Sequence, residues 1–224
     1  MYDRIDALDR LAQVPNALND PRVQAALLAR LEADHNADPR ERNEDWAGDY
    51  YAKLLSFVVA VYRRHPSERA LVLLVNGYYN EESAFAKWLA NQRPALPLFL
   101  QNLNHTDFNR RGQAAYLLAL MVRHELDRRS TGGPGYRSRL SDVDIESIRS
   151  RVRAMVDSET HAMARQQALA ALGVCGESRD VARLHGIAAD VFADESTRKA
   201  ALAAADMIKG RSVPDSGSSR PQAR

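Results

Sequence analysis

The sequence predicts an all-α fold, and three observations carry the prediction. Apolar residues recur at helical spacing, for example at Trp46, Tyr50, Leu54, Val58 and Tyr62. No run alternates strictly between apolar and polar residues, as a half-buried strand would. Helix-capping residues and Pro or Gly stops bracket the apolar segments. We expect about ten helices, one of which could be a stub, drawn from residues 2–13, 21–33, 45–64, 67–76, 81–92, 95–103, 107–128, 142–156, 161–173, 179–193 and 196–209.

Most of these segments open with a side chain that can accept a hydrogen bond from a free backbone N–H group. Asp20 precedes Pro21, and Ser141 stands three residues before Asp144. The expected capping residues are Asp20, Ser67, Asn80, Asp107, Ser141, Ser178 and Ser196. Each such cap stabilises a helix by ~1 kcal/mol.

Residues 70–75 leave two interpretations open. Five of the six residues in Ala70-Leu71-Val72-Leu73-Leu74-Val75 are Leu or Val, as in a buried strand. The preceding Ser67 and the following Asn76-Gly77 favour a short helix, which Gly77 would end in the left-handed conformation.

The capped helices also share a pattern: an acid or a polar cap, then Arg, then Ala and Leu on one face. Two clear copies are Asp20-Pro21-Arg22-Val23-Gln24-Ala25-Ala26-Leu27 and Ala164-Arg165-Gln166-Gln167-Ala168-Leu169-Ala170-Ala171-Leu172-Gly173. Copies begin near residues 21, 67, 108, 161 and 196, which is the spacing of paired-helix repeats. Over about residues 20–209 these motifs resemble the HEAT-repeat family.

The resemblance implies a right-handed α-solenoid of HEAT-like antiparallel helix pairs. It implies one repeat domain over residues 1–210, interrupted by a Gly-rich insertion near 130–136. Ala at positions such as Ala168, Ala171, Ala201 and Ala205 would let neighbouring helices approach closely. The tail 211–224 is rich in Ser, Pro and Gly, and we expect it to be disordered.

Composition and targeting signals narrow the class of protein. With 45% apolar residues and a net charge of +2, the 224-residue chain is not disordered as a whole. Its longest strongly apolar stretch, 54–62, is far shorter than the roughly 20 residues of a membrane span, so we expect no membrane partner. The lone Cys175 excludes an intramolecular disulfide. The start of the chain lacks a signal peptide and predicts a cytoplasmic location, although a processed exported domain would look the same.

Arginine residues are the main candidates for a charged binding site. Seven arginines and two acids lie between residues 109 and 139, so the middle of the chain is basic. An anion or partner could bind there, at Arg110, Arg111, Arg123, His124, Arg128 and Arg129. A solvated face is the competing interpretation. A second set of arginines recurs with the repeats, and it could form a cationic ladder on a concave surface. The resemblance to HEAT repeats implies instead that these arginines pair with Asp20, Asp107, Asp157 and Asp194. The set is Arg22, Arg69, Arg110 or Arg111, Arg165 and Arg198.

Other side chains give weaker candidates. Tyr78, Tyr79 and Trp88 could form an aromatic contact surface, or they could cap the core. The six histidines show no metal-ligand spacing, and no phosphate-binding or nucleophile motif is present. We therefore expect no metal, no cofactor and no catalytic residue.

The most favoured function is a non-catalytic scaffold that presents an extended surface to a protein partner. The alternative is a nucleic-acid-binding protein similar to the HEAT-like DNA alkylation-repair glycosylases. Those enzymes need an Asp near Trp and Arg in an aromatic cleft, and neither Trp46 nor Trp88 can be placed beside such a pair. A HEAT-like lyase or chaperone acting on another protein's cofactor is a third class.

Overall fold

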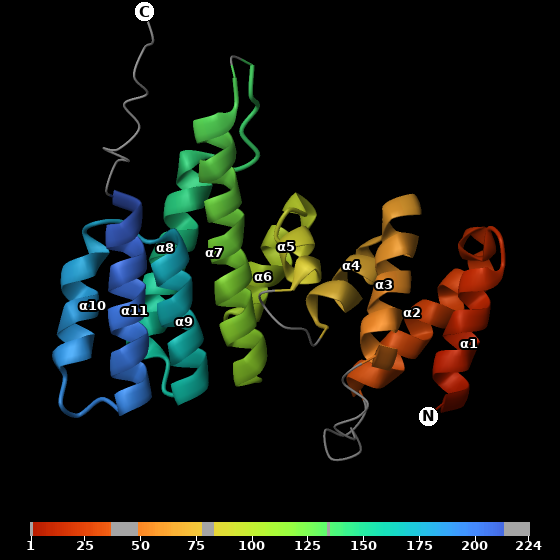
Figure 1. Ribbon diagram of the computed structural model, residues 1–224, viewed down its shortest axis with the longest axis horizontal. Coiled ribbons are helices and arrows are strands. Elements are labelled where there is room, and N and C mark those ends of the chain that lie inside the picture. The colour runs from red at the N-terminus through yellow and green to blue at the C-terminus, as the bar shows by residue number, and fades with distance from the viewer. Residues whose placement is uncertain (1, 37–48, 78–82, 134, 213–224) are drawn as a thin grey trace, which may run out of the picture. The chain divides into compact units, whose positions relative to one another are not determined.

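A computed structural model describes residues 2–36, 49–77, 83–133 and 135–212 of the chain (Figure 1). This part of the chain contains helices and no strand, so the prediction of an all-α fold is confirmed. The α-helices are α1 (Tyr2–Gln13), α2 (Pro21–Asn36), α3 (Asp49–Arg64), α4 (Glu68–Val75), α5 (Ala84–Leu89), α6 (Leu96–Asn102), α7 (Phe108–Thr131), α8 (Asp142–Ser158), α9 (Ala162–Cys175), α10 (Asp180–Ala189) and α11 (Glu195–Ser212). Short 3-10 helices η1 (Ala17–Asn19) and η4 (Arg93–Ala95) precede α2 and α6.

Several expected caps lie at the helix starts. The backbone N–H of Arg22 donates to Asp20 at 2.8 Å, and that of Ala70 donates to Ser67 at 3.2 Å. Asp107 caps α7, and Ser141 forms a reciprocal capping box with Asp144 at the start of α8. Asn80 lies outside the described residues.

Two expected caps are wrong. Asp194, not Ser196, caps α11, because the N–H of Thr197 donates to Asp194 at 2.8 Å. Ser178 does not cap α10 with its side chain; instead its carbonyl accepts the N–H of Val181 at 3.3 Å. Near the start of α10, the Asp180 carboxylate accepts the N–H of Glu177 at 2.9 Å.

The segment 70–75 lies in α4 and is therefore helical, not a strand. Gly77 does not adopt a left-handed conformation, because Asn16 and Gly135 alone have positive φ in the described part of the chain. A Cβ at Gly77 would lie 3.1 Å from the Tyr51 hydroxyl. Close approach to α3 therefore explains this glycine better than a turn does.

The chain divides into two compact units, Met1–Phe85 and Ala86–Arg224. In the first unit α3 contacts α1, α2 and α4. Its core includes Leu31, Leu54, Val58 and Leu74, whose side chains are fully buried. This apolar set lines one face of each helix, as the periodicity predicts.

In the second unit, consecutive helices pair as α6 with α7, α8 with α9, and α10 with α11. The second members of these pairs also contact one another, with α9 between α7 and α11 (Figure 1). The single repeat domain expected over residues 1–210 stays a prediction. Residues 211 and 212 of the expected tail belong to α11, and residues 213–224 lie outside the described part.

Small residues lie where α9 packs on α7 and on α11. A Cβ at Gly112 of α7 would overlap the side chain of Gln167, and one at Gly173 of α9 would lie 2.9 Å from the Ala204 Cα. The alanines Ala164, Ala168, Ala171, Ala201, Ala204 and Ala205 are fully buried in the same unit. The close approaches expected at Ala168 and Ala171 thus extend to glycine.

None of the described helices combines the length and apolarity that crossing a lipid bilayer requires.

Candidate functional site

The six residues of the predicted anion or partner site all lie on α7, but they fall in two groups. Arg110 and Arg111 are in its first turn, and Arg123, His124, Arg128 and Arg129 are in its C-terminal part. With a rise of about 1.5 Å per residue, the two groups are separated by roughly 20 Å along the helix. The structure therefore does not join them in a single patch.

The three arginines of the C-terminal group already have partners. Arg123 pairs with Asp127 at 3.0 Å, and the guanidinium of Arg128 donates to the side-chain oxygen of Asn91. Burial, together with the nearby Arg128, lowers the pKa of His124, so this imidazole is neutral at pH 7. Asp127 thus neutralises Arg123, whereas Arg128 keeps its positive charge because its acceptor, Asn91, is neutral.

Arg129 takes part in a network centred on the buried side chain of Glu125. The Glu125 carboxylate accepts hydrogen bonds from Arg129 Nε at 3.1 Å, Ser138 Oγ at 2.5 Å and Tyr136 Oη at 3.0 Å. The N–H of Arg139 donates to it as well. Burial alone would raise the pKa of Glu125, but these donors lower it overall. The segment that follows the Gly-rich insertion is thus tied to α7.

Arg111 ties three segments together. Its Nε and Nη2 atoms donate to the two carboxylate oxygens of Glu159, at 2.6 and 2.9 Å. Its Nη1 atom donates to the carbonyls of His105 and Thr106, at 2.8 and 2.9 Å. The hydrogen bonds from Arg111 lower the pKa of Glu159, whose other role is to accept the N–H of His161. Arg111 is therefore a structural clamp between the α6–α7 loop and the end of α8.

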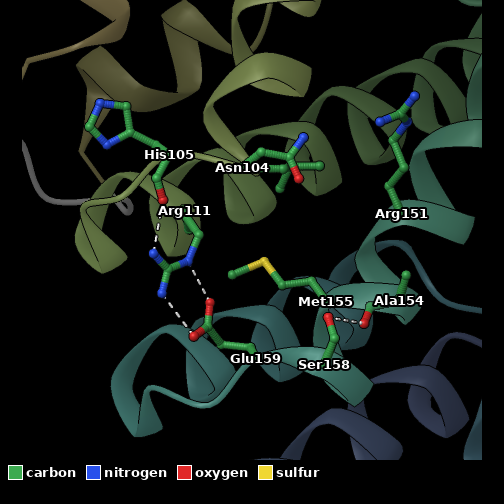
Figure 2. Close-up of a pocket in the computed structure, with 9 residues that line it drawn as sticks. Asn104, His105, Arg111, Arg151, Ala154, Met155, Ser158 and Glu159 are labelled. Carbon is green, nitrogen blue, oxygen red and sulfur yellow. Dashed lines mark hydrogen bonds and ion pairs between the residues drawn. The ribbon is translucent and has the colours of Figure 1, made fainter.

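A cleft of about 490 Å³ opens beside this clamp. Figure 2 shows the α6–α7 loop on one side of it and α8 with the residue after it on the other. The lining residues are Leu103, Asn104, His105, Arg111, Arg151, Ala154, Met155, Ser158 and Glu159. Leu103 and Met155 are buried and give the cleft an apolar part.

The polar groups of the cleft differ in how far they are engaged. Arg111 and Glu159 neutralise each other, and the hydroxyl of Ser158 donates to the Ala154 carbonyl at 2.9 Å. The exposed Arg151 makes no ion pair or hydrogen bond within the described residues. One guanidinium thus supplies the cleft with positive charge that nothing in the described chain neutralises.

The aromatic candidates separate into two sets. Tyr78 and Tyr79 lie outside the described residues. Trp88 is on α5, where its side chain is half-buried and its carbonyl accepts a hydrogen bond from Gln92 at 3.2 Å.

The expected pairing of repeat arginines with aspartates is not the observed one. Arg69 pairs with Glu32, Arg111 with Glu159, and Arg165 donates to the carbonyl of Val156 at 3.1 Å. The aspartates serve other purposes: Asp20 and Asp107 accept N–H groups at helix starts, Asp194 caps α11, and Asp157 pairs with Arg183. Short side chains at a helix start reach the local backbone more easily than a distant guanidinium.

Sequence reasoning missed two ionic clusters, each of which contains a buried aspartate. In the second unit Arg153 binds Asp180 at 2.8 Å and Glu146 at 2.7 Å, which raises the pKa of Arg153. In the first unit the buried Asp34 pairs with Arg30, four residues earlier on α2. The i, i+4 spacing of Arg30 and Asp34 was one available signal, and Glu146 and Arg153 lie two turns apart on α8. Arg153 and Asp180 belong to different helices and gave no signal.

The possible metal ligands of the described residues are dispersed, and the one cysteine is buried. Its His, Cys, Asp and Glu side chains form no group of three that could hold a metal ion. Cys175 is buried at the end of α9, and burial raises the pKa of its thiol to about 12.

Comparison with known protein families, with curated proteins and with solved structures finds no match for this chain.

Proposed function

We propose that this protein is a non-catalytic binding module. Its partner is a protein that places an acidic segment in the cleft between the α6–α7 loop and α8. The unpartnered guanidinium of Arg151 at this cleft is the observation that carries the proposal. We further propose that the paired helices α6–α11 form a HEAT-like right-handed solenoid.

The cleft suits a peptide segment because it offers both kinds of contact that a peptide needs. Arg151 and the exposed amide of Asn104 can bind a carboxylate and a backbone group. Leu103 and Met155 supply apolar surface beside them. An acidic segment with interspersed apolar residues matches this arrangement.

A binding role is better supported than catalysis. The carboxylate of Glu159 is held by Arg111 and by the N–H of His161, so its lone pairs are engaged. The hydroxyl of Ser158 donates within its own helix, and no described base lies within hydrogen-bond distance of it. The side chains of Glu159 and Ser158 therefore hold the fold together.

A nucleic-acid partner has less support. In the C-terminal part of α7, two arginines that could contact phosphates already bind acidic side chains of this chain: Arg123 binds Asp127, and Arg129 binds Glu125 and Asp142. Phosphate recognition along a duplex needs several free cations in a row.

Fluorescence anisotropy tests the proposal with a labelled Glu/Leu peptide and a Lys/Leu peptide of the same length. We expect the wild-type protein to bind the Glu/Leu peptide and not the Lys/Leu peptide. Arg151→Glu should weaken binding at least about 10-fold, because it removes a charge-assisted hydrogen bond and adds repulsion. Arg22→Glu is the matched control, since Arg22 is also exposed, lies on a helix and forms no described ion pair.

Equal binding of the two peptides by the wild-type protein would contradict the proposal. So would an Arg151→Glu variant that binds the Glu/Leu peptide as tightly as the Arg22→Glu control does.

A further inference from the structure

The two adjacent arginines at the start of α7 differ in their surroundings. Arg111 directs its donors at four oxygen acceptors, as described above. Arg110 has no oxygen acceptor in the described part of the chain, and its Nε atom is buried without a hydrogen-bond partner. Among the described residues, the one hydrogen-bond contact of the Arg110 guanidinium is with the ring of His105, whose Nε2 lies 3.3 Å from Arg110 Nη1.

This contact joins two donors. The backbone N–H of Asp107 donates to His105 Nδ1 at 2.9 Å, so Nδ1 must carry a lone pair. A neutral imidazole with an accepting Nδ1 carries its proton on Nε2. A guanidinium has donors and no acceptor. The Nε2–H of His105 and the Nη1–H groups of Arg110 therefore face a common space without an acceptor between them.

The described carboxylates near the N-terminal end of α7 do not accept hydrogen bonds from Arg110 or from His105 Nε2. Asp107 accepts the N–H of Asn109 at 2.9 Å, and Glu159 is held by Arg111. A partly buried cation with unused donors is unfavourable unless an acceptor joins it.

We propose that Arg110 and His105 Nε2 form a binding site for an oxyanion, whose oxygen bridges the two donors. The ligand class is a carboxylate or a phosphate, which both present oxygens that accept from two N–H groups at once. Figure 2 shows the His105 ring turned away from the Arg111–Glu159 pair. An oxyanion bound between His105 Nε2 and Arg110 would therefore not be part of that clamp. The site shares His105 with the lining of the peptide cleft, but it needs neither Arg151 nor a protein partner.

Proton-detected nitrogen NMR on the full-length protein tests the site directly. The side-chain Nε–H signal of Arg110 and the ring nitrogens of His105 are followed as inorganic phosphate is added, and acetate is added in a second series. Sodium chloride at matched ionic strength is the third series. Arg111 is the internal control, because Glu159 already saturates its Nε–H.

We expect phosphate, acetate or both to shift the Arg110 and His105 signals saturably, with a dissociation constant on the order of 1 mM. The anion that produces saturable shifts identifies the ligand class. Arg111 and the sodium chloride series should show no such change. Arg110→Gln should weaken the His105 response at least about 10-fold, and Arg22→Gln should leave it unchanged.

Three results would overturn the site. They are unsaturable shifts, shifts of the same size with sodium chloride, and an unchanged His105 response in Arg110→Gln. The proposed function fails separately, because the peptide test depends on Arg151 and uses neither Arg110 nor a small anion.

Discussion

Arginine side chains join separate helices in the second unit by binding oxygens on neighbouring segments. Arg111 and Glu159 stand 48 positions apart in the sequence and form two parallel hydrogen bonds. Their side chains are 20% and 5% exposed, so solvent screens this pair less than an exposed one. We therefore expect the loss of this ion pair to destabilise the protein clearly.

Glu159→Gln should lower the free energy of unfolding by about 2–4 kcal/mol, because it leaves the partly buried Arg111 without its counter-charge. Urea unfolding of Glu159→Gln, Arg111→Gln and the double variant measures the coupling. Glu195→Gln is the control, since Glu195 pairs with Lys199 at an exposed site. Additive losses in the double variant would contradict a direct interaction.

The Arg111–Glu159 pair also predicts how the stability of the folded protein changes with pH. Because the folded-state pKa of Glu159 is lowered from its ordinary 4.5, its contribution to stability is present above 4.5. It is lost as the pH falls through the lowered value. Arg111→Gln should therefore flatten the decline of the urea midpoint below pH 4.5. A decline as steep as that of the wild-type protein would show that Glu159 does not gain from Arg111.

Cys175 should be unreactive in the folded protein. Its thiol is buried and its pKa is raised to about 12, so almost no thiolate exists at pH 8. We expect a chromogenic disulfide reagent to label Cys175 only when urea unfolds the chain. Rapid labelling in native buffer would contradict the burial of this thiol.

Individual helices are held by close packing where α9 meets α7 and α11. A Cβ at Gly173 would lie 2.9 Å from the Cα and 3.1 Å from the Cβ of Ala204. A Cβ at Gly186, in the interior of α10, would have no atom within 4 Å. These two helical glycines thus form a matched pair of sites.

Gly173→Ala should lower the free energy of unfolding by about 1–2 kcal/mol, because overpacking outweighs the better helix propensity of alanine. Gly186→Ala should raise it by about 0.5–1 kcal/mol, because only the propensity changes. Thermal or urea unfolding checks both. The same sign of change in the two variants would contradict the close approach of α9 and α11.

The segment after the Gly-rich insertion is held to α7 by the network around Glu125. Glu125→Ala removes the acceptor for Tyr136, Ser138 and the Arg139 N–H. We expect trypsin to cut the variant faster at the exposed Arg137 and Arg139. Glu146→Ala, which removes an exposed acidic side chain of α8, is the control. Equal cleavage rates would show that the network does not hold this segment.

Helices and their caps could be predicted from the sequence because they depend on neighbouring residues. The spacing of Leu54 and Val58 and the caps Asp20 and Ser141 are local signals, and the structure contains each of them. Helix boundaries moved by a few residues, for example at α7, which continues to Thr131.

The candidate site could not be predicted in the same way. Arg111 was singled out as basic, but its partner Glu159 is distant in the sequence and gave no signal. Arg151 stands in an ordinary amphipathic helix, and its lack of a partner is visible only in three dimensions. Charge counts overestimated the free positive charge on α7 because they could not show which arginines are paired.

At the scale of the whole molecule, each compact unit has its own core of helix contacts. The second unit contains the cleft and the Arg111–Glu159 clamp beside it. The clamp joins the α6–α7 loop to the end of α8, and these two segments form the walls of the cleft. The shape of the proposed binding site therefore depends on an ion pair that does not itself need to touch the partner.

The central claim is that an acidic segment binds in this cleft. Hydrogen exchange measured by mass spectrometry, with and without a saturating Glu/Leu peptide, tests it most directly. Slower exchange confined to segments 103–111 and 151–162 is the predicted result, because these segments line and border the cleft. No change in exchange, or slowing confined to residues 49–77 of the first unit, would contradict the claim.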